Sequence, residues 1–134
     1  MCKTIKLKVK FQANPLRVYE LLTNEKKFRS FSGKKASIKE KVGSSFSNYD
    51  EHVSGIMVDL SPGERVVQAW RHRKFPKGIF SMASFNLVST HKGGTELTLT
   101  HRGVPKELIP KICEDWRNLY WDKMKKYLDT QYVT

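Results

Sequence analysis

The chain has 134 residues, the length of one domain, and 39% of them are hydrophobic, which is enough to form a buried core. Its 25 lysines and arginines outnumber its 13 aspartates and glutamates, and the net charge of +12 favours acidic partners such as nucleic acid, anionic lipid or an acidic protein face. No apolar run approaches the roughly 20 residues of a membrane span, and the first residues lack the apolar core of a signal peptide. We therefore expect a single domain over residues 1–134, located in the cytoplasm.

The positive charge is concentrated in the N-terminal third of the chain. Residues 1–41 hold 12 lysines and arginines against 3 glutamates, whereas residues 42–134 hold 13 basic and 10 acidic residues. Charge alone leaves two interpretations open. One is a surface that binds an acidic partner, and the other is a lysine-rich surface that only keeps the protein in solution.

The first third of the sequence predicts a strand and two short helices. Between residues 4 and 11 apolar side chains alternate with threonine and lysine, the period of a strand with one buried face. Asn14 and Pro15 are favoured at the cap and the first position of a helix. The apolar stripe expected on this helix is Leu16, Val18, Tyr19 and Leu22. Asn24 is placed to cap a second short helix that ends before Gly33.

From residue 35 to residue 103 the pattern is that of short strands joined by tight turns. The expected strands cover residues 36–38, 45–49, 52–60, 65–73, 80–88 and 96–104. Glycine, proline and polar residues separate these strands, as in Ser61-Pro62-Gly63-Glu64. Strands at hairpin spacing indicate an antiparallel sheet.

After Pro105, apolar residues recur every three or four positions, which predicts one long helix from about Lys106 to Tyr132. Pro110 is tolerated only in the first turn, so the regular helix is expected to begin near it. A helix with a wide apolar face must pack across the sheet. The predicted fold class is therefore α+β: a curved antiparallel sheet of about six or seven strands wrapped around a long C-terminal helix, with two short helices after the first strand.

Several stretches of the sequence, in this order, resemble the family of activators of heat shock protein 90 ATPase. They are Val18–Thr23, Gly43–Phe46, Val53–Gly55, Val67–Arg71, Gly94–Thr100, Gly103–Pro105 and the aromatic residues Trp116, Tyr120 and Trp121. The similarity is to the C-terminal domain of these co-chaperones and to single-domain bacterial homologues, which implies the helix-grip fold of the START-like (SRPBCC) superfamily. Ser44 departs from the family by replacing the usual second glycine of its turn. We expect no counterpart of the family's N-terminal domain among these 134 residues.

The resemblance implies a non-enzymatic module that binds heat shock protein 90 and stimulates its ATPase. The sequence leaves open whether stimulation persists without the N-terminal domain. A basic patch on loops would meet an acidic face of the chaperone. The residues expected to form this patch are Lys34, Lys35, Lys39, Lys41, Arg71, Arg73, Lys74 and Lys77. A solvated surface without a partner is the alternative interpretation.

The alternative function is binding of a small hydrophobic ligand or a lipid in a cavity between the sheet and the C-terminal helix. Strand alternation and helix spacing direct one set of side chains toward this space: Phe46, Met57, Gln68, Trp70, His72, Ala83, Phe85, Leu97, Leu99, His101, Trp116 and Tyr120. Apolar walls with a few polar groups are typical of small-molecule sites. A filled core, closed by the large aromatic rings, is the other interpretation of the same set.

Metal binding, catalysis and nucleic-acid binding have no supporting pattern. The histidines and the two cysteines, Cys2 and Cys113, lack the spacing of zinc ligands. Gly93-Gly94 joins two strands and lacks the following lysine of a phosphate-binding loop. No acidic pair lies on an inward face, and only the charge points to nucleic acid. We therefore expect no cofactor, no metal and no catalytic residue.

Overall fold

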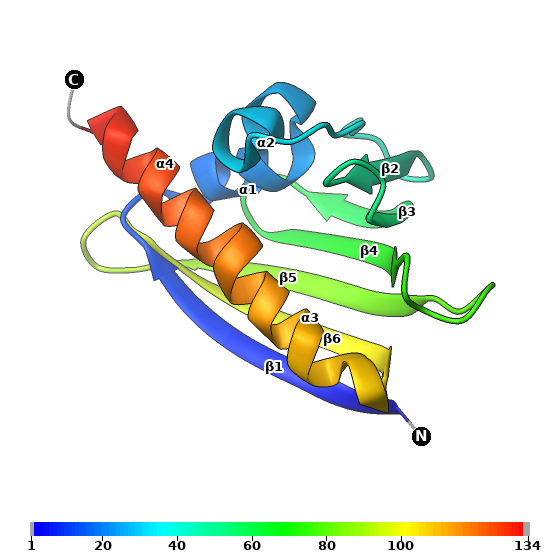
Figure 1. Ribbon diagram of the computed structural model, residues 1–134. Helices are drawn as coiled ribbons and strands as arrows, with labels where there is room; N and C mark the ends of the chain where they lie inside the picture. The colour runs from blue at the N-terminus through cyan, green and yellow to red at the C-terminus, as the bar shows by residue number, and fades with distance from the viewer. Residues whose placement is uncertain (1, 133–134) are drawn as a thin grey trace.

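One antiparallel sheet and one long C-terminal helix dominate the computed structural model, which describes residues 2–132 (Figure 1). The strands are β1 (Cys2–Phe11), β2 (Ser45–Asn48), β3 (Val53–Ser61), β4 (Arg65–His72), β5 (Ser81–Ser89) and β6 (Thr95–Pro105). Two short helices, α1 (Pro15–Thr23) and α2 (Glu25–Ser32), follow β1. The C-terminal helix is built from η1 (Lys106–Leu108), α3 (Ile109–Asp115), η2 (Trp116–Trp121) and α4 (Asp122–Tyr132).

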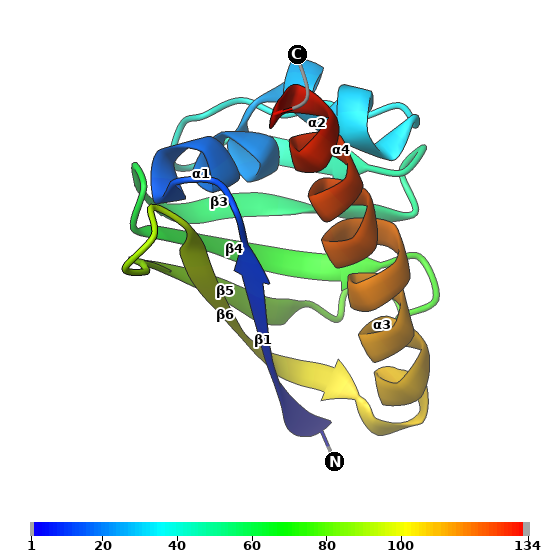
Figure 2. The same ribbon diagram turned by 90° about the vertical axis from the view of Figure 1, so that its left-hand side faces the viewer.

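The six strands are ordered β1-β6-β5-β4-β3-β2, and each pairs antiparallel with its neighbour. The first strand, β1, therefore pairs with the last, β6, and these two ends of the chain's strand order are neighbours. Successive hairpins from β6 back to β2 form the rest of the sheet, so β1 and β2 are its two edges. Figure 2 shows the long helix running along one face of the sheet, with α1 and α2 near its C-terminal end. The α+β helix-grip architecture predicted from the sequence is confirmed.

The two short helices begin and end as their caps predict. The Asn14 side chain accepts a hydrogen bond from the Arg17 N–H at 2.9 Å, and the Asn24 side chain accepts one from the Lys27 N–H at 3.0 Å. Gly33 ends α2 with a φ of 71°, a conformation that favours glycine.

The predicted apolar stripe of α1 is wrong at Leu16, which is 51% exposed. Leu16 lies in the first turn of the helix, against the Gly63 turn between β3 and β4 rather than over the sheet. The buried side chains of α1 are Val18, Tyr19, Leu21, Leu22 and Thr23.

The strand expected at residues 36–38 is wrong, because this segment makes only one isolated bridge, between Ser37 and Ser47. Side chains from α2 bind backbone groups of this segment that point away from β2. The Arg29 guanidinium donates two hydrogen bonds to the Ala36 carbonyl, at 2.8 and 3.0 Å, and the Ile38 N–H donates one to the Glu25 carboxylate at 3.0 Å. These side chains satisfy the outward backbone groups of the segment, and its pairing with β2 is confined to Ser37.

The C-terminal helix contains a π-helical turn, η2, that the three- and four-residue spacing did not predict. The Asp122 N–H donates to the Arg117 carbonyl, five residues earlier, as a π turn requires. The wider turn brings Trp116 and Trp121 onto the buried side together, where their rings stack with centroids 5.6 Å apart. Tyr120 is buried in the same turn.

The inward face of the sheet carries a buried polar network centred on His101. The Trp116 N–H donates to His101 Nδ1 at 3.1 Å, so the ring proton resides on Nε2. That proton is donated to Ser81 Oγ at 2.7 Å, and the Ser81 hydroxyl donates to the Trp70 carbonyl at 2.8 Å. Burial lowers the pKa of His101 to about 3, so the imidazole is neutral at physiological pH.

Gly55 lets β3 and β4 approach closely. A Cβ atom at this position would lie 1.8 Å from the Ala69 carbonyl oxygen and 2.8 Å from the Phe46 ring. We expect Gly55→Ala to lower the free energy of unfolding by about 3 kcal/mol or more, because a backbone atom must move. Ser54→Ala, on the neighbouring position, should change it by less than about 0.5 kcal/mol. Urea unfolding of both variants measures the difference, and equal stabilities would contradict this account of the β3–β4 contact.

His101 should make stability depend on pH. Below about pH 6.5 the unfolded chain takes up a proton that the buried ring cannot, so a contribution fully present above that pH is lost as the pH falls toward 3. Between pH 7.5 and pH 5.0 the wild type should lose about 2 kcal/mol more than His101→Gln, in which no ring titrates. Urea unfolding at the two pH values tests this, because all other titrating groups are common to both proteins. Parallel losses would show that His101 does not carry the dependence.

Candidate functional site

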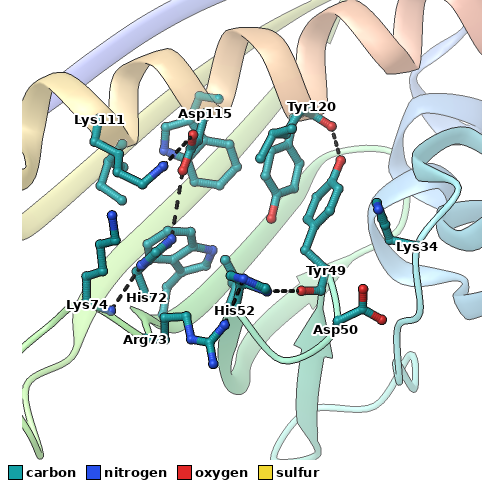
Figure 3. Close-up of a pocket in the computed structure, with 15 residues that line it drawn as sticks. Lys34, Tyr49, Asp50, His52, His72, Arg73, Lys74, Lys111, Asp115 and Tyr120 are labelled. Atoms are coloured by element: carbon teal, nitrogen blue, oxygen red, sulfur yellow. Dashed lines mark hydrogen bonds and ion pairs between the residues drawn. The ribbon is translucent and has the colours of Figure 1, made fainter.

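A cleft of about 730 Å³ opens between the N-terminal half of the long helix and the sheet (Figure 3). The helix contributes Lys111, Ile112, Asp115, Trp116, Leu119 and Tyr120. The strands contribute Val53, Trp70 and His72. The connecting segments contribute Lys34, Tyr49, Asp50, His52, Arg73 and Lys74. The volume is that of a small-molecule site.

Aromatic rings form the floor of the cleft. The Trp70 and Trp116 centroids lie 5.4 Å apart, Trp116 and Tyr120 4.4 Å apart, and Tyr120 and Tyr49 5.5 Å apart. Burial raises the pKa of Tyr49 and of Tyr120 well above the ordinary value of a tyrosine, and the charge of Asp115 raises both further. Tyr49 also raises the pKa of Tyr120, so both hydroxyls stay protonated. The floor is therefore apolar and uncharged.

Two polar groups of this floor have incomplete hydrogen bonding. Trp70 is 2% exposed, and its indole N–H makes no hydrogen bond of normal geometry among the described residues. It lies close enough to the Tyr120 hydroxyl to oppose part of the rise in that pKa. The Tyr120 oxygen accepts one long hydrogen bond, from the Asn48 amide at 3.4 Å. Buried donors without an acceptor are uncommon and costly in native structures.

One wall of the cleft is formed by His72, Asp115 and Lys111. His72 Nδ1 accepts from the Lys74 N–H at 3.1 Å, so its proton lies on Nε2, which faces Asp115 at 3.8 Å (Figure 3). Lys111 pairs with the same carboxylate at 3.3 Å. Burial lowers the pKa of His72, and the opposing effect of Asp115 does not offset it, so the ring is neutral at pH 7.

The rim of the cleft includes a strained turn. Tyr49, Asp50 and Glu51 have φ values of 53°, 55° and 69°, a left-handed run of three non-glycine residues. This conformation costs roughly 1–2 kcal/mol per residue. His52 holds the turn by donating to the Tyr49 carbonyl at 2.6 Å and accepting from Arg73 at 2.8 Å. The Tyr49 hydroxyl also donates to the Leu119 carbonyl of the long helix (Figure 3).

The twelve residues expected around a cavity divide into two groups. Trp70, His72, Trp116 and Tyr120 line the cleft. The other eight lie in the core: Phe46, Met57, Gln68, Ala83, Phe85, Leu97, Leu99 and His101. All twelve are buried, as the strand alternation and the helix spacing predict. Their role in ligand binding stays a prediction.

The eight residues expected to form one basic patch do not all lie together on the surface. Lys34, Arg73 and Lys74 border the cleft, and the Lys35 carbonyl accepts from the Asp50 N–H beside it. Lys39 and Lys41 lie at the opposite end of β2, where their carbonyls bind Ser44. The Arg71 guanidinium is used within the β4–β5 loop, where it donates to the carbonyls of residues 75, 76 and 79. Lys77 is exposed in that loop.

Sequence reasoning missed several residues of the cleft, among them Tyr49, His52, Lys111 and Asp115. Tyr49 was expected to end a strand, and nothing in the residue types signals a left-handed turn there. The four-residue spacing of Lys111 and Asp115 does predict their contact on a helix. It cannot show that the pair borders a cleft, because the opposite wall comes from β4.

Among residues 2–132, no group of three or more histidines, cysteines and acidic residues is placed to hold a metal ion. No helix within this part of the chain is long and apolar enough to cross a membrane.

Three comparisons relate the chain to known proteins. The family model described as Activator of Hsp90 ATPase homolog 1-like protein matches residues 12–129. The activator of 90 kDa heat shock protein ATPase homolog of Dictyostelium discoideum is 31% identical over 123 residues, which cover 92% of this chain and 32% of that protein. Homolog 1 of Homo sapiens is 29% identical over 125 residues, covering 93% and 36%. The chain thus spans about a third of the length of these relatives.

Solved structures support the fold. An HSP90 activator from Plasmodium falciparum has a TM-score of 0.78 at 19% identity, with 88% of this chain and 89% of that chain covered. The Aha1 dimer from Colwellia psychrerythraea has a TM-score of 0.78 at 16% identity, with 92% and 93% covered. With the family match extending from α1 into α4, the chain belongs to the family of Activator of Hsp90 ATPase homolog 1-like proteins.

Proposed function

We propose that this domain acts in the cytoplasm as a non-enzymatic co-chaperone that binds heat shock protein 90 and stimulates its ATPase. The observation that carries the proposal is the family match over residues 12–129. The relatives from Dictyostelium discoideum and Homo sapiens are named as activators of this ATPase. These names describe an effect on another protein's reaction, which agrees with a binding module.

The surface proposed for this contact is the rim patch, which we define as Lys34, Lys35, Arg73 and Lys74. All four side chains are exposed. The Asp50–Lys35 backbone hydrogen bond and the Arg73–His52 hydrogen bond hold their segments beside one turn. Clustered cations of this kind steer an acidic partner toward one orientation and make association sensitive to salt.

Lys39 and Lys41 are not part of the rim patch. Their carbonyls bind Ser44, before the start of β2, whereas the Lys35 carbonyl binds Asp50, after its end. Their charges add to the net charge of +12, which accelerates encounter without fixing its geometry. Arg71 is excluded from the contact for a different reason, since its guanidinium is bound to loop carbonyls. The proposal therefore assigns the contact to four of the eight residues.

The test compares two double variants with the same change in net charge. Lys35→Glu with Lys74→Glu reverses the rim patch, and Lys6→Glu with Lys8→Glu reverses two exposed lysines that face Thr100 and Thr98 on β6. With the heat shock protein 90 of the same organism, the wild type should bind and raise ATP turnover, and both effects should weaken with salt. The rim variant should bind about tenfold more weakly at low salt, whereas the β1 variant should stay within about twofold of the wild type.

Because the chain spans about a third of its curated relatives, binding and ATP turnover are measured separately. Binding without a rise in turnover would restrict the proposal to the contact. Absence of binding at low salt would refute it. Equal losses in the two double variants would refute the rim patch and leave only a general effect of charge.

A further inference from the structure

We infer that the outer face of the sheet docks on an anionic lipid bilayer, where an apolar patch enters the membrane surface and a row of lysines contacts the headgroups. The outer face is the one turned away from the long helix (Figure 2). This inference goes beyond chaperone binding and does not depend on it. It rests on the apolar side chains of this face, on its charge and on its shape.

Four exposed apolar side chains lie on the outer face, and we call them the outer patch: Ile56, Val58, Phe80 and Met82. Each is between 40% and 49% exposed. Ile56 pairs with Ala69, and Ala69 pairs with Met82, so one row of the patch crosses three neighbouring strands. Phe80 and Val58 lie two residues from Met82 and Ile56, and strand alternation directs them to the same face. Exposed apolar groups gathered in this way mark an interaction surface.

The outer face carries an excess of positive charge. Six of its side chains are cationic and two are carboxylates, which leaves +4. They are Lys6, Lys8, Lys10, Arg65, Arg71, Arg102, Asp59 and Glu96. One carboxylate is already paired, since Asp59 accepts from Arg65 at 2.7 Å. Anionic lipid attracts such cations, and each lysine or arginine held at the membrane surface adds to the affinity.

The cations and the outer patch are close enough to contact one surface together. Lys6 pairs with Thr100 of β6, and Thr100 pairs with Ser84 of β5, which follows Met82 by two residues. Two strand spacings separate Lys6 from Ser84, a distance of about 10 Å. Arg102 lies between the two groups, because it pairs with Met82 and is exposed on the same face. Long cationic side chains reach headgroups while their apolar stems stay beside the hydrocarbon.

The composition of the outer patch favours lipid over nucleic acid. Single-stranded nucleic acid binds to basic surfaces by stacking its bases on aromatic rings. Phe80 is the one aromatic residue of the patch, and the Arg71 guanidinium already lies over its ring, 5.9 Å from the centroid. The aliphatic side chains of Ile56, Val58 and Met82 offer no stacking surface, but they gain free energy on leaving water for hydrocarbon.

The shape of the outer face favours a bilayer over an acidic protein. The sheet curves toward the long helix, so its outer face is convex (Figures 1 and 2). A protein partner would have to supply a concave apolar surface of matching shape, because packing density at protein interfaces equals that of protein interiors. A fluid bilayer adapts its surface to a convex one and needs no such match.

The first experiment sediments the purified protein with two kinds of vesicle, phosphatidylcholine alone and phosphatidylcholine with about 30 mol% phosphatidylserine. We expect saturable binding to the anionic vesicles that weakens between about 50 and 300 mM salt, and at least about twentyfold weaker binding to the neutral ones. Equal binding to the two kinds of vesicle, or none to the anionic kind at low salt, would overturn the inference.

The second experiment uses the two double variants designed for chaperone binding, in the opposite sense. Lys6→Glu with Lys8→Glu should weaken binding to the anionic vesicles at least about twentyfold. Lys35→Glu with Lys74→Glu has the same net charge but alters the rim patch beside the cleft, and should weaken it less than about threefold. Chaperone binding is expected to show the reverse order, so either proposal can fail without the other. Equal losses of vesicle binding would overturn this one.

The third experiment tests the apolar contact with two side chains of matched exposure. Phe80 is 49% exposed and Leu16, on α1 and outside the outer patch, is 51% exposed. Phe80→Ser should weaken binding to the anionic vesicles at least about fivefold, whereas Leu16→Ser should stay within about twofold of the wild type. Both positions are at the surface, so both variants should fold. Equal affinities of the two variants would contradict insertion of the patch.

A fluorescence measurement locates the inserted residue directly. Phe80→Trp and Leu16→Trp each add one surface tryptophan to three native ones that are buried. With anionic vesicles that contain brominated phosphatidylcholine, the added fluorescence of Phe80→Trp should be quenched and that of Leu16→Trp should not. Quenching of neither would overturn the inference. Tighter binding to single-stranded polyuridylate than to the vesicles, weakened by Phe80→Ser, would instead assign the face to nucleic acid.

Discussion

The fold depends on burying one aromatic side chain of the long helix against three strands at once. Trp116 contacts Trp70 of β4, Phe85 of β5 and His101 of β6, and its N–H donates to His101 in the core. The sheet must curve to bring three strands around one indole. The π turn that begins at Trp116 then rotates the helix so that Tyr120 and Trp121 are buried with it. Trp116 thus joins the long helix to three strands at the start of the turn that buries Tyr120 and Trp121.

The same rings belong to the core and to the candidate site. Trp70, Trp116 and Tyr120 fill the space between sheet and helix on one side and form the floor of the cleft on the other. Truncating any of them would therefore create a cavity in the core as well as alter the cleft. Only substitutions that preserve the ring can separate binding from stability, and for the same reason the floor of the cleft is rigid.

The sequence predicted correctly those features that depend on interactions between residues close together in the chain. The strand alternation and the two asparagine caps were correct because burial of one face and capping of free N–H groups act within a few residues. The failures have longer-range causes. Residues 36–38 pair with β2 only at Ser37 and are otherwise bound by side chains of α2. The turn at Tyr49–Glu51 is anchored through Tyr49 to the long helix 70 residues later. The expected basic patch does not form as one surface, because Lys35 and Lys39 lie at opposite ends of β2 although they are close in sequence.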